Sequence, residues 1–262
     1  MRQTKMTLIY SLIVSLMLGF ANVPASGQDT TKPKQANKTK QAKDKKTAQK
    51  KPKTNPALLP LKEIDPKLPN VLIIGDSISI GYTIATRKEL AGVANLFRPL
   101  TNCGPTTRGL EGMDSWLGDR KWDVIHFNFG LHDLKYISPN SGLADPKNKT
   151  SRQQVPPEDY AANLKKIAQR LKKTGAVVIW RETTPVPKGA KGRIVGDSKK
   201  YNEIAAKVMM EVGDIETDAM FAFATESVPQ LPANVHYSQQ SSAKLAKHVA
   251  EVITKALNAK SK

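Results

Sequence analysis

The chain is poor in cysteine, histidine and aromatic residues. Of its 262 residues, one is cysteine, four are histidine and 6% are aromatic. Cys103 has no partner for a disulfide within the chain, so packing alone must stabilise the folded core. The histidines include no pair spaced as His-x-x-x-His, which disfavours a metal hydrolase built from His132, Asp133 and His236. Aromatic residues interleaved with basic ones, a pattern of nucleic-acid-binding proteins, are also lacking.

Only one long apolar run occurs, and it lies near the N-terminus. Arg2 and Lys5 give a basic start, residues 6–20 are nearly all apolar, and residues 23–25 offer a cleavage region. This pattern is typical of an export signal, so we expect residues 1–28 to be a signal peptide. The run falls short of the ~20 residues that span a bilayer comfortably, which favours cleavage over a retained anchor. We therefore expect a secreted or periplasmic protein.

Residues 29–57 have almost no large apolar side chains. Their ten lysines and two aspartates contribute +8 to the formal net charge of +18. Such a segment cannot bury enough surface to offset its ordering entropy, so we expect a disordered, lysine-rich linker. A basic segment on an exported chain suits an anionic polymer or envelope surface, and we expect no nucleic-acid partner.

Residues 58–262 alternate between strand-like and helical patterns and are long enough for one domain. Short apolar runs predict buried parallel strands at 71–74, 94–100, 124–129, 176–180 and 215–221. Amphipathic patterns predict helices at 78–90, from 157 to a closing segment at 172–175, at 197–212 and at 238–257. Strands that alternate with helices predict a three-layer α/β/α sandwich with a five-stranded parallel sheet. The polar segment 138–156 fits no element and is interpreted as a mobile surface loop or a functional flap.

Ser77 stands where the first predicted strand ends in a tight turn. The apolar run 70–74 gives way abruptly to Gly75-Asp76-Ser77. Chemistry in open α/β sheets gathers outside the carboxyl ends of the strands, so the Ser77 hydroxyl is expected to open toward a crevice. Backbone amides at the start of the next helix offer positive potential to a developing oxyanion. The alternative is that Asp76 or Ser77 only caps that helix.

A serine nucleophile needs a base that is near in space, and the chain offers four histidines. His248 lies within the last predicted helix and is expected to be solvated. His126 lies in the third predicted strand, where a hydrogen-bonded core histidine is expected. His132 and His236 lie in loops, and His236 directly precedes the last helix, from which it could reach the carboxyl edge of the sheet.

Four short segments follow one another at strand exits and helix entries. They are Gly75-Asp76-Ser77-Ile78-Ser79, residues 102–110 with Gly104, Phe129-Gly130-Leu131-His132-Asp133, and Val235-His236-Tyr237-Ser238. In order, spacing and placement they resemble the sequence blocks of the GDSL, or SGNH, hydrolase family. The resemblance covers about residues 69–258. It implies a flavodoxin-like sandwich and the hydrolysis of carboxylic esters.

The resemblance also implies roles for individual residues. Ser77 would attack an acyl carbonyl after His236 takes its proton. The amides of Ser77 and Gly104 would bind the resulting oxyanion. His132 stands where the family usually has asparagine. A neutral imidazole can also donate an N–H to the oxyanion, whereas a protonated His132 would make the site pH-sensitive.

The family's acidic residue is missing at its usual place. The family has aspartate three residues before the histidine, and this chain has Ala233 there. Asn234, one place nearer, can hold the tautomer of His236 but cannot stabilise imidazolium by charge. A carboxylate from elsewhere, such as Asp218, is the alternative orienting group. A dyad without an acid remains a further alternative.

Together these features predict an exported serine esterase, with a small ester as substrate and no cofactor or metal. Acyl groups on carbohydrate are the favoured substrate, because no long apolar segment suggests a tunnel for a lipid chain. Two alternatives stay open. One is a lipid-directed esterase or acyl-thioesterase, and the other is a non-catalytic binding protein that has lost the triad acid.

Overall fold

The computed structural model describes residues 54–260. The predicted signal peptide, 1–28, and the predicted linker up to residue 53 lie outside the described residues. The end of that linker belongs to the folded part, because a 3-10 turn forms at Pro56–Leu58 and Ala57 is buried. The folded part therefore begins before residue 58, the boundary that the sequence predicted.

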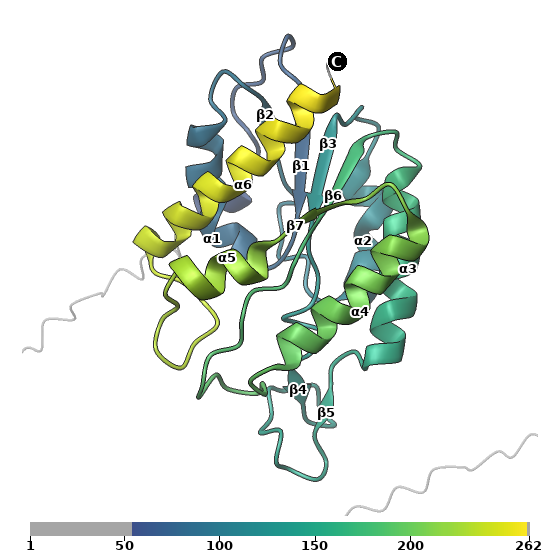
Figure 1. The fold of residues 1–262 in the computed structure, drawn as a ribbon, viewed down its shortest axis with the longest axis vertical. Helices are drawn as coiled ribbons and strands as arrows, with labels where there is room; N and C mark the ends of the chain where they lie inside the picture. The colour runs from purple at the N-terminus through teal and green to yellow at the C-terminus, as the bar shows by residue number, and fades with distance from the viewer. Residues whose placement is uncertain (1–53, 261–262) are drawn as a thin grey trace, which may run out of the picture. The chain divides into compact units, whose positions relative to one another are not determined.

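A parallel sheet of five strands runs through the domain in the order β2-β1-β3-β6-β7 (Figure 1). Its strands are β1 (Asn70–Ile74), β2 (Asn95–Phe97), β3 (Val124–Phe127), β6 (Val177–Arg181) and β7 (Glu216–Asp218). The strand order reverses between β1 and β3, and such a switch point is where open α/β sheets bind their ligands.

Six helices cover the two faces of the sheet. They are α1 (Ser77–Glu89), α2 (Thr106–Leu117), α3 (Pro157–Lys172), α4 (Asp197–Val212), α5 (Met220–Ser227) and α6 (Gln239–Lys260). Helices α1 and α6 pack together on one face, and α2, α3 and α4 pack in sequence on the other (Figure 1). The predicted three-layer α/β/α sandwich with five parallel strands is confirmed. Within residues 54–260, no helix has both the length and the apolar character that a membrane crossing requires.

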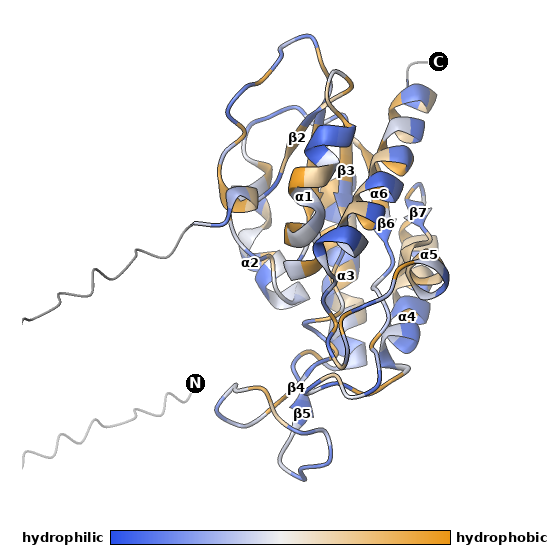
Figure 2. Cartoon of the chain, turned by 90° about the vertical axis from the view of Figure 1, so that its left-hand side faces the viewer, coloured by the Kyte–Doolittle hydropathy of each residue, from blue (hydrophilic) through white to orange (hydrophobic). Residues whose placement is uncertain are grey.

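The hydrophobic core consists largely of the apolar segments from which the strands and helices were predicted. Residues 71–74 of β1 are at most 2% exposed, because helices cover this central strand on both sides. Helix α6 alternates hydrophilic and hydrophobic residues along its length (Figure 2). Its inward face consists largely of Leu245, Val249 and Ile253, all fully buried. The apolar residues that recur along α6 with a period of 3.6 residues therefore form the face that packs against the sheet.

Several elements differ from the prediction in length or in kind. Strand β2 stops at Phe97, just before Arg98 and Pro99, because proline cannot donate to a strand ladder. Strand β7 ends at Asp218, and the residues predicted to continue it begin helix α5 instead. Helix α2 was not predicted, because its two glycines weaken the helical signal.

The segment 138–156 follows the short strand β4 (Tyr136–Ile137) and contains its antiparallel partner β5 (Arg152–Gln153), a strand that the sequence did not predict. Inside it, Ser138 N donates to Gly142 O at 2.8 Å. At its base, Tyr136 N donates to Gly192 O at 2.7 Å, which ties the segment to the loop before α4. The segment is thus built on a small hairpin of its own.

Candidate active site

Ser77 is the first residue of α1 and follows the carboxyl end of β1. Its Oγ lies 2.8 Å from Nε2 of His236, so the structure joins two residues that are 159 positions apart in the sequence. Asp76 caps the helix, since its Oδ1 accepts a hydrogen bond from Ile78 N at 3.0 Å. The capping alternative therefore holds for Asp76, and the Ser77 hydroxyl is left to pair with the histidine.

Asn234 orients the imidazole of His236. The Nδ1 atom of His236 lies 2.8 Å from Asn234 Oδ1, which also accepts from the backbone N–H of His236 at 3.1 Å. That second bond identifies the contacting atom as the amide oxygen. Because this oxygen can only accept, Nδ1 carries the proton and Nε2 presents a lone pair to the Ser77 hydroxyl. This is the tautomer that a general base requires.

The turn before α6 holds this arrangement in place. Leu231 N donates to His236 O at 2.9 Å, and Asn234 N donates to Leu231 O at 3.1 Å. The Gln230 amide adds a bond to Val235 O at 3.0 Å. Ala233 lies in this turn with a φ of 52°, a left-handed conformation that asparagine and aspartate adopt more readily than alanine.

Asp218, the alternative orienting group, pairs with two other histidines. Its Oδ2 lies 2.9 Å from His126 Nε2, and its Oδ1 lies 2.6 Å from His248 Nε2. Although burial alone would raise the pKa of Asp218, these two hydrogen bonds hold it well below its usual range. Both carboxylate oxygens are thus used away from His236, and Asn234 is the residue found beside it.

The other two histidines confirm one prediction and correct another. His126 is 1% exposed and bonded in the core, as predicted. Burial lowers its pKa despite the opposing hydrogen bond with Asp218. His248 was predicted to be solvated, which is wrong. Its side chain is 20% exposed and stacks on Phe223, with 4.2 Å between ring centroids.

Gly104 lies in the loop that enters α2 and has a φ of +64°. Any Cβ there would come within 3.2 Å of Arg108 Cδ, so the position suits glycine on two grounds. Its backbone N–H donates to Asn102 Oδ1 at 3.0 Å. The predicted oxyanion donor is thus occupied by a neighbouring side chain and would exchange that partner for an oxyanion.

His132 lines the same hollow as Gly104. Burial lowers the pKa of His132, and the nearby positive groups Lys135 and Arg193 add to this effect, although Asp76 opposes it. The imidazole is therefore neutral at neutral pH. Of the two protonation states that the sequence left open, the structure favours the neutral one, which can still donate an N–H.

Asp133 is a residue to which the sequence assigned no role in the fold. Its Oδ1 accepts from Thr106 N at 2.8 Å and from Thr106 Oγ1 at 2.6 Å. Burial raises the pKa of Asp133 to about 7, and the bonds from Thr106 only partly offset this. Asp133 thereby fastens the loop that carries His132 to the start of α2. The feature of the sequence that could have pointed to Asp133 is its position directly after His132, at the exit of a strand.

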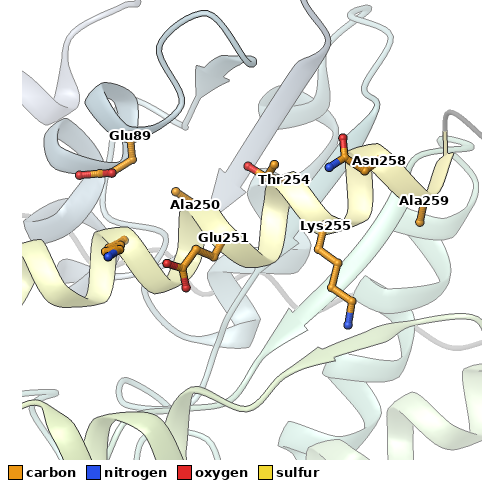
Figure 3. Close-up of a pocket in the computed structure, with 8 residues that line it drawn as sticks. Glu89, Ala250, Glu251, Thr254, Lys255, Asn258 and Ala259 are labelled. Atoms are coloured by element: carbon orange, nitrogen blue, oxygen red, sulfur yellow. The ribbon is translucent and has the colours of Figure 1, made fainter.

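A hollow of about 530 Å³ opens beside these residues, with a mainly polar lining. It is lined by Asn102, Gly104, Pro105, Thr107, Arg108, Glu111, His132 and Gln154. A larger hollow of about 710 Å³ lies along α6, beside the end of α1 (Figure 3). No serine or histidine lines that hollow, which is formed by Glu89, Lys247, Ala250, Glu251, Thr254, Lys255, Asn258 and Ala259. The smaller hollow contains Gly104 and His132, two of the oxyanion donors that the sequence predicts.

A metal centre finds no support within residues 54–260, where no three His, Cys, Asp or Glu side chains are placed to hold an ion. Cys103 is buried, and burial raises the pKa of its thiol to about 11, so it is not a thiolate nucleophile. Serine chemistry is what the arrangement can perform. His236 lies within hydrogen-bond distance of the Ser77 hydroxyl, and the loop with Gly104 carries a potential oxyanion donor.

The fold and the contact between Ser77 and His236 are those expected of a serine hydrolase. The family model described as GDSL-like Lipase/Acylhydrolase matches residues 71–249, and the chain belongs to this family. It is thus a carboxylic ester hydrolase of the GDSL type. The suspected family is confirmed. A search of curated proteins found no match.

Solved structures of esterases share the fold. The acetyl xylan esterase AlAXEase is 14% identical with a TM-score of 0.54, covering 70% of this chain and 99% of its own. The lipase/acylhydrolase from Enterococcus faecalis is 15% identical with a TM-score of 0.55, covering 71% and 96%. Axe2, an acetylxylan esterase from Geobacillus stearothermophilus, is 16% identical with a TM-score of 0.54, covering 71% and 94%.

Proposed function

We propose that this chain is an exported serine esterase in which Ser77, His236 and Asn234 carry out acyl transfer to water. The hydrogen-bonded chain from Ser77 Oγ through the imidazole to Asn234 Oδ1 is the observation that carries the proposal. Both contacts are 2.8 Å, within the reach required of a nucleophile, its base and the group that orients the base.

The reaction follows from this geometry. His236 Nε2 takes the proton of Ser77 as Oγ attacks the acyl carbonyl, and the imidazolium then returns that proton to the leaving alcohol. Water hydrolyses the acyl-serine by the same steps in reverse. Asn234 keeps the imidazole in its productive tautomer, but its neutral amide does not offset the positive charge that develops.

Three groups are proposed to stabilise the oxyanion. Ser77 N belongs to the first residue of α1, and such an N–H has no partner inside the helix. Gly104 N would leave Asn102 Oδ1 for the stronger charge of the oxyanion. Neutral His132 supplies the side-chain donor that asparagine provides elsewhere in the family. Loss of one such donor typically costs about 2.7–4 kcal/mol of transition-state stabilisation.

We propose small acyl groups on carbohydrate as the substrate. The hollow beside Gly104 presents amide, hydroxyl, guanidinium and carboxylate groups, which suit hydroxyl-rich ligands. Two of the structures with the same fold carry the names of acetyl xylan esterases, which agrees with this choice.

Ser77→Ala tests the proposal. It should abolish turnover of a short-chain aryl ester and of acetylated xylan while the melting temperature stays unchanged, because Ser77 is only half-buried. A folded variant with undiminished turnover would exclude the serine mechanism. If the wild-type protein cleaves only long-chain acyl esters, the substrate is a lipid and not an acylated carbohydrate.

Export and surface attachment rest on the N-terminal sequence alone. We propose that the signal peptide 1–28 is removed and that the basic segment holds the enzyme near an anionic polymer or envelope surface. The N-terminal sequence of the protein recovered outside the cytoplasm tests cleavage. Salt-sensitive binding to an acidic polysaccharide, compared with a variant lacking residues 29–53, tests attachment.

A further inference from the structure

Arg98 is a buried cation, and among residues 54–260 no carboxylate forms a salt bridge with it. It follows β2 and is 5% exposed. Burial lowers its pKa, as expected for a charge removed from water. Its guanidinium makes five hydrogen bonds, all to neutral oxygens: Gly75 O, Ser79 Oγ, Thr83 Oγ1, Pro99 O and Thr101 O. A charge is expensive to bury without an ionic partner, so this arrangement needs an explanation beyond packing.

Two of these bonds join the backbone turns on which the reaction depends. Arg98 Nη2 donates to Gly75 O at 3.3 Å, two residues before Ser77, and to Thr101 O at 3.2 Å, three residues before Gly104. Cys103 N also donates to Gly75 O, at 3.3 Å. Arg98 therefore clamps the turn of the nucleophile to the loop that carries the second oxyanion donor.

The other amino group of Arg98 reaches the first turns of α1. Its Nη1 donates to Thr83 Oγ1 at 2.9 Å and to Ser79 Oγ at 3.2 Å. Ser79 Oγ in turn donates to Asp76 O at 2.8 Å, directly beside the nucleophile. One rigid group thus fixes the strand exit, the helix start and the oxyanion loop relative to one another.

We infer that Arg98 is a positioning residue that sets the separation between the amides of Ser77 and Gly104. This inference rests on the proposed function, since it assigns the geometry of the same oxyanion hole. The planar guanidinium offers five donors in a fixed fork, which a lysine ammonium cannot reproduce.

Three variants of the full chain test the inference: Arg98→Met, Arg98→Lys and the control Arg87→Met. Arg87 is a second partly buried arginine on the same side of the sheet, and its Nε makes one bond to Leu96 O at 3.2 Å. The measurements are kcat and KM for a short-chain aryl ester, the affinity for a boronic acid that mimics the tetrahedral intermediate, and the melting temperature.

We expect Arg98→Met to lower kcat about 10²-fold with little change in KM, because a misplacement of about 1 Å can cost that much. Affinity for the boronic acid should fall in parallel with kcat, since both report transition-state binding. The kcat and the boronic acid affinity of Arg98→Lys should lie between those of Arg98→Met and those of the wild type. Arg87→Met should change kcat little.

Arg98→Lys carries the test if Arg98→Met fails to fold. Arg98 variants with a lower melting temperature but wild-type kcat and boronic acid affinity would overturn the inference, since Arg98 would then be merely structural. Ser77→Ala, measured alongside, separates the two proposals. An inactive Ser77→Ala beside fully active Arg98 variants removes only the role of Arg98, whereas an active Ser77→Ala removes the proposed function itself.

Discussion

Two histidine clusters in this protein have opposite compositions. At the surface, His236 lies between a serine hydroxyl and an amide, with no carboxylate in contact. In the interior, His126 and His248 share the carboxylate of Asp218, with no nucleophile in contact. The aspartate–histidine pairing that a serine hydrolase normally uses for catalysis is therefore present in the fold, but Ser77 is hydrogen-bonded to His236 and to neither of these two histidines.

The contrast shows that residue types alone do not identify a catalytic pair. Asp218 lies at the end of β7 and links β3 to α6, because one of its oxygens bonds to each. There it accepts hydrogen bonds from one buried and one half-buried imidazole. Asn234 can orient His236 at much smaller desolvation cost, since an amide carries no charge, but it gives up electrostatic help in the transition state.

The largest effect is expected from the histidines themselves. His236→Ala should lower kcat/KM for an aryl ester by about 10²–10⁴-fold, because Ser77 loses its general base. The matched control is His248→Ala, which should lower the melting temperature and leave kcat/KM near the wild-type value. Reversed effects of the two substitutions would mean that the catalytic histidine belongs to the interior cluster.

Substitutions of Asn234 sharpen the comparison further. Asn234→Ala should lower kcat about fivefold, since one orienting hydrogen bond is worth about 1 kcal/mol. Asn234→Asp should raise kcat above wild type, because a carboxylate at the same place stabilises the imidazolium that forms during attack. Both effects can be read from steady-state kinetics at saturating ester. Equal rates for all three proteins would show that His236 works without an orienting partner.

Substitutions in the interior cluster of His126, His248 and Asp218 should change the free energy of unfolding and not the rate of ester hydrolysis. Asp218→Asn should lower the free energy of unfolding by about 1.5–3 kcal/mol, the range for a hydrogen bond to a charged group, because His126 is neutral at pH 8. Urea unfolding at pH 8 measures this loss. A variant as stable as the wild type would mean that the cluster contributes nothing to folding.

The same cluster predicts a pH dependence of stability. The depressed pKa of Asp218 contributes stability that is present above about pH 4 and is lost as pH falls through the folded pKa. The depressed pKa of His126 acts in the same direction below about pH 6.5, because the unfolded chain takes up the proton first. Below about pH 4, further acidification should therefore destabilise the wild type more than Asp218→Asn, which lacks this carboxylate. Parallel curves between pH 3 and 8 would contradict this.

The sequence predicted the features that depend on local pattern. Apolar runs located the strands, amphipathic spacing located α3, α4 and α6, and the loop position of His236 marked it as the base. The partners of His248 could not be read from the sequence, because its contact with Asp218 depends on how α6 crosses the sheet. The bond from Gly104 N to Asn102 Oδ1 also escaped prediction, since it depends on one turn geometry.

The central claim is that Ser77 is the nucleophile and His236 is its base. Labelling the protein with a fluorophosphonate and mapping the adduct by mass spectrometry tests both, if His236→Ala is treated in parallel. We predict one adduct, on Ser77, with labelling strongly slowed in His236→Ala and unaffected in Asp218→Asn. An adduct on another residue, or labelling of Ser77 that depends on Asp218 and not on His236, would contradict the account.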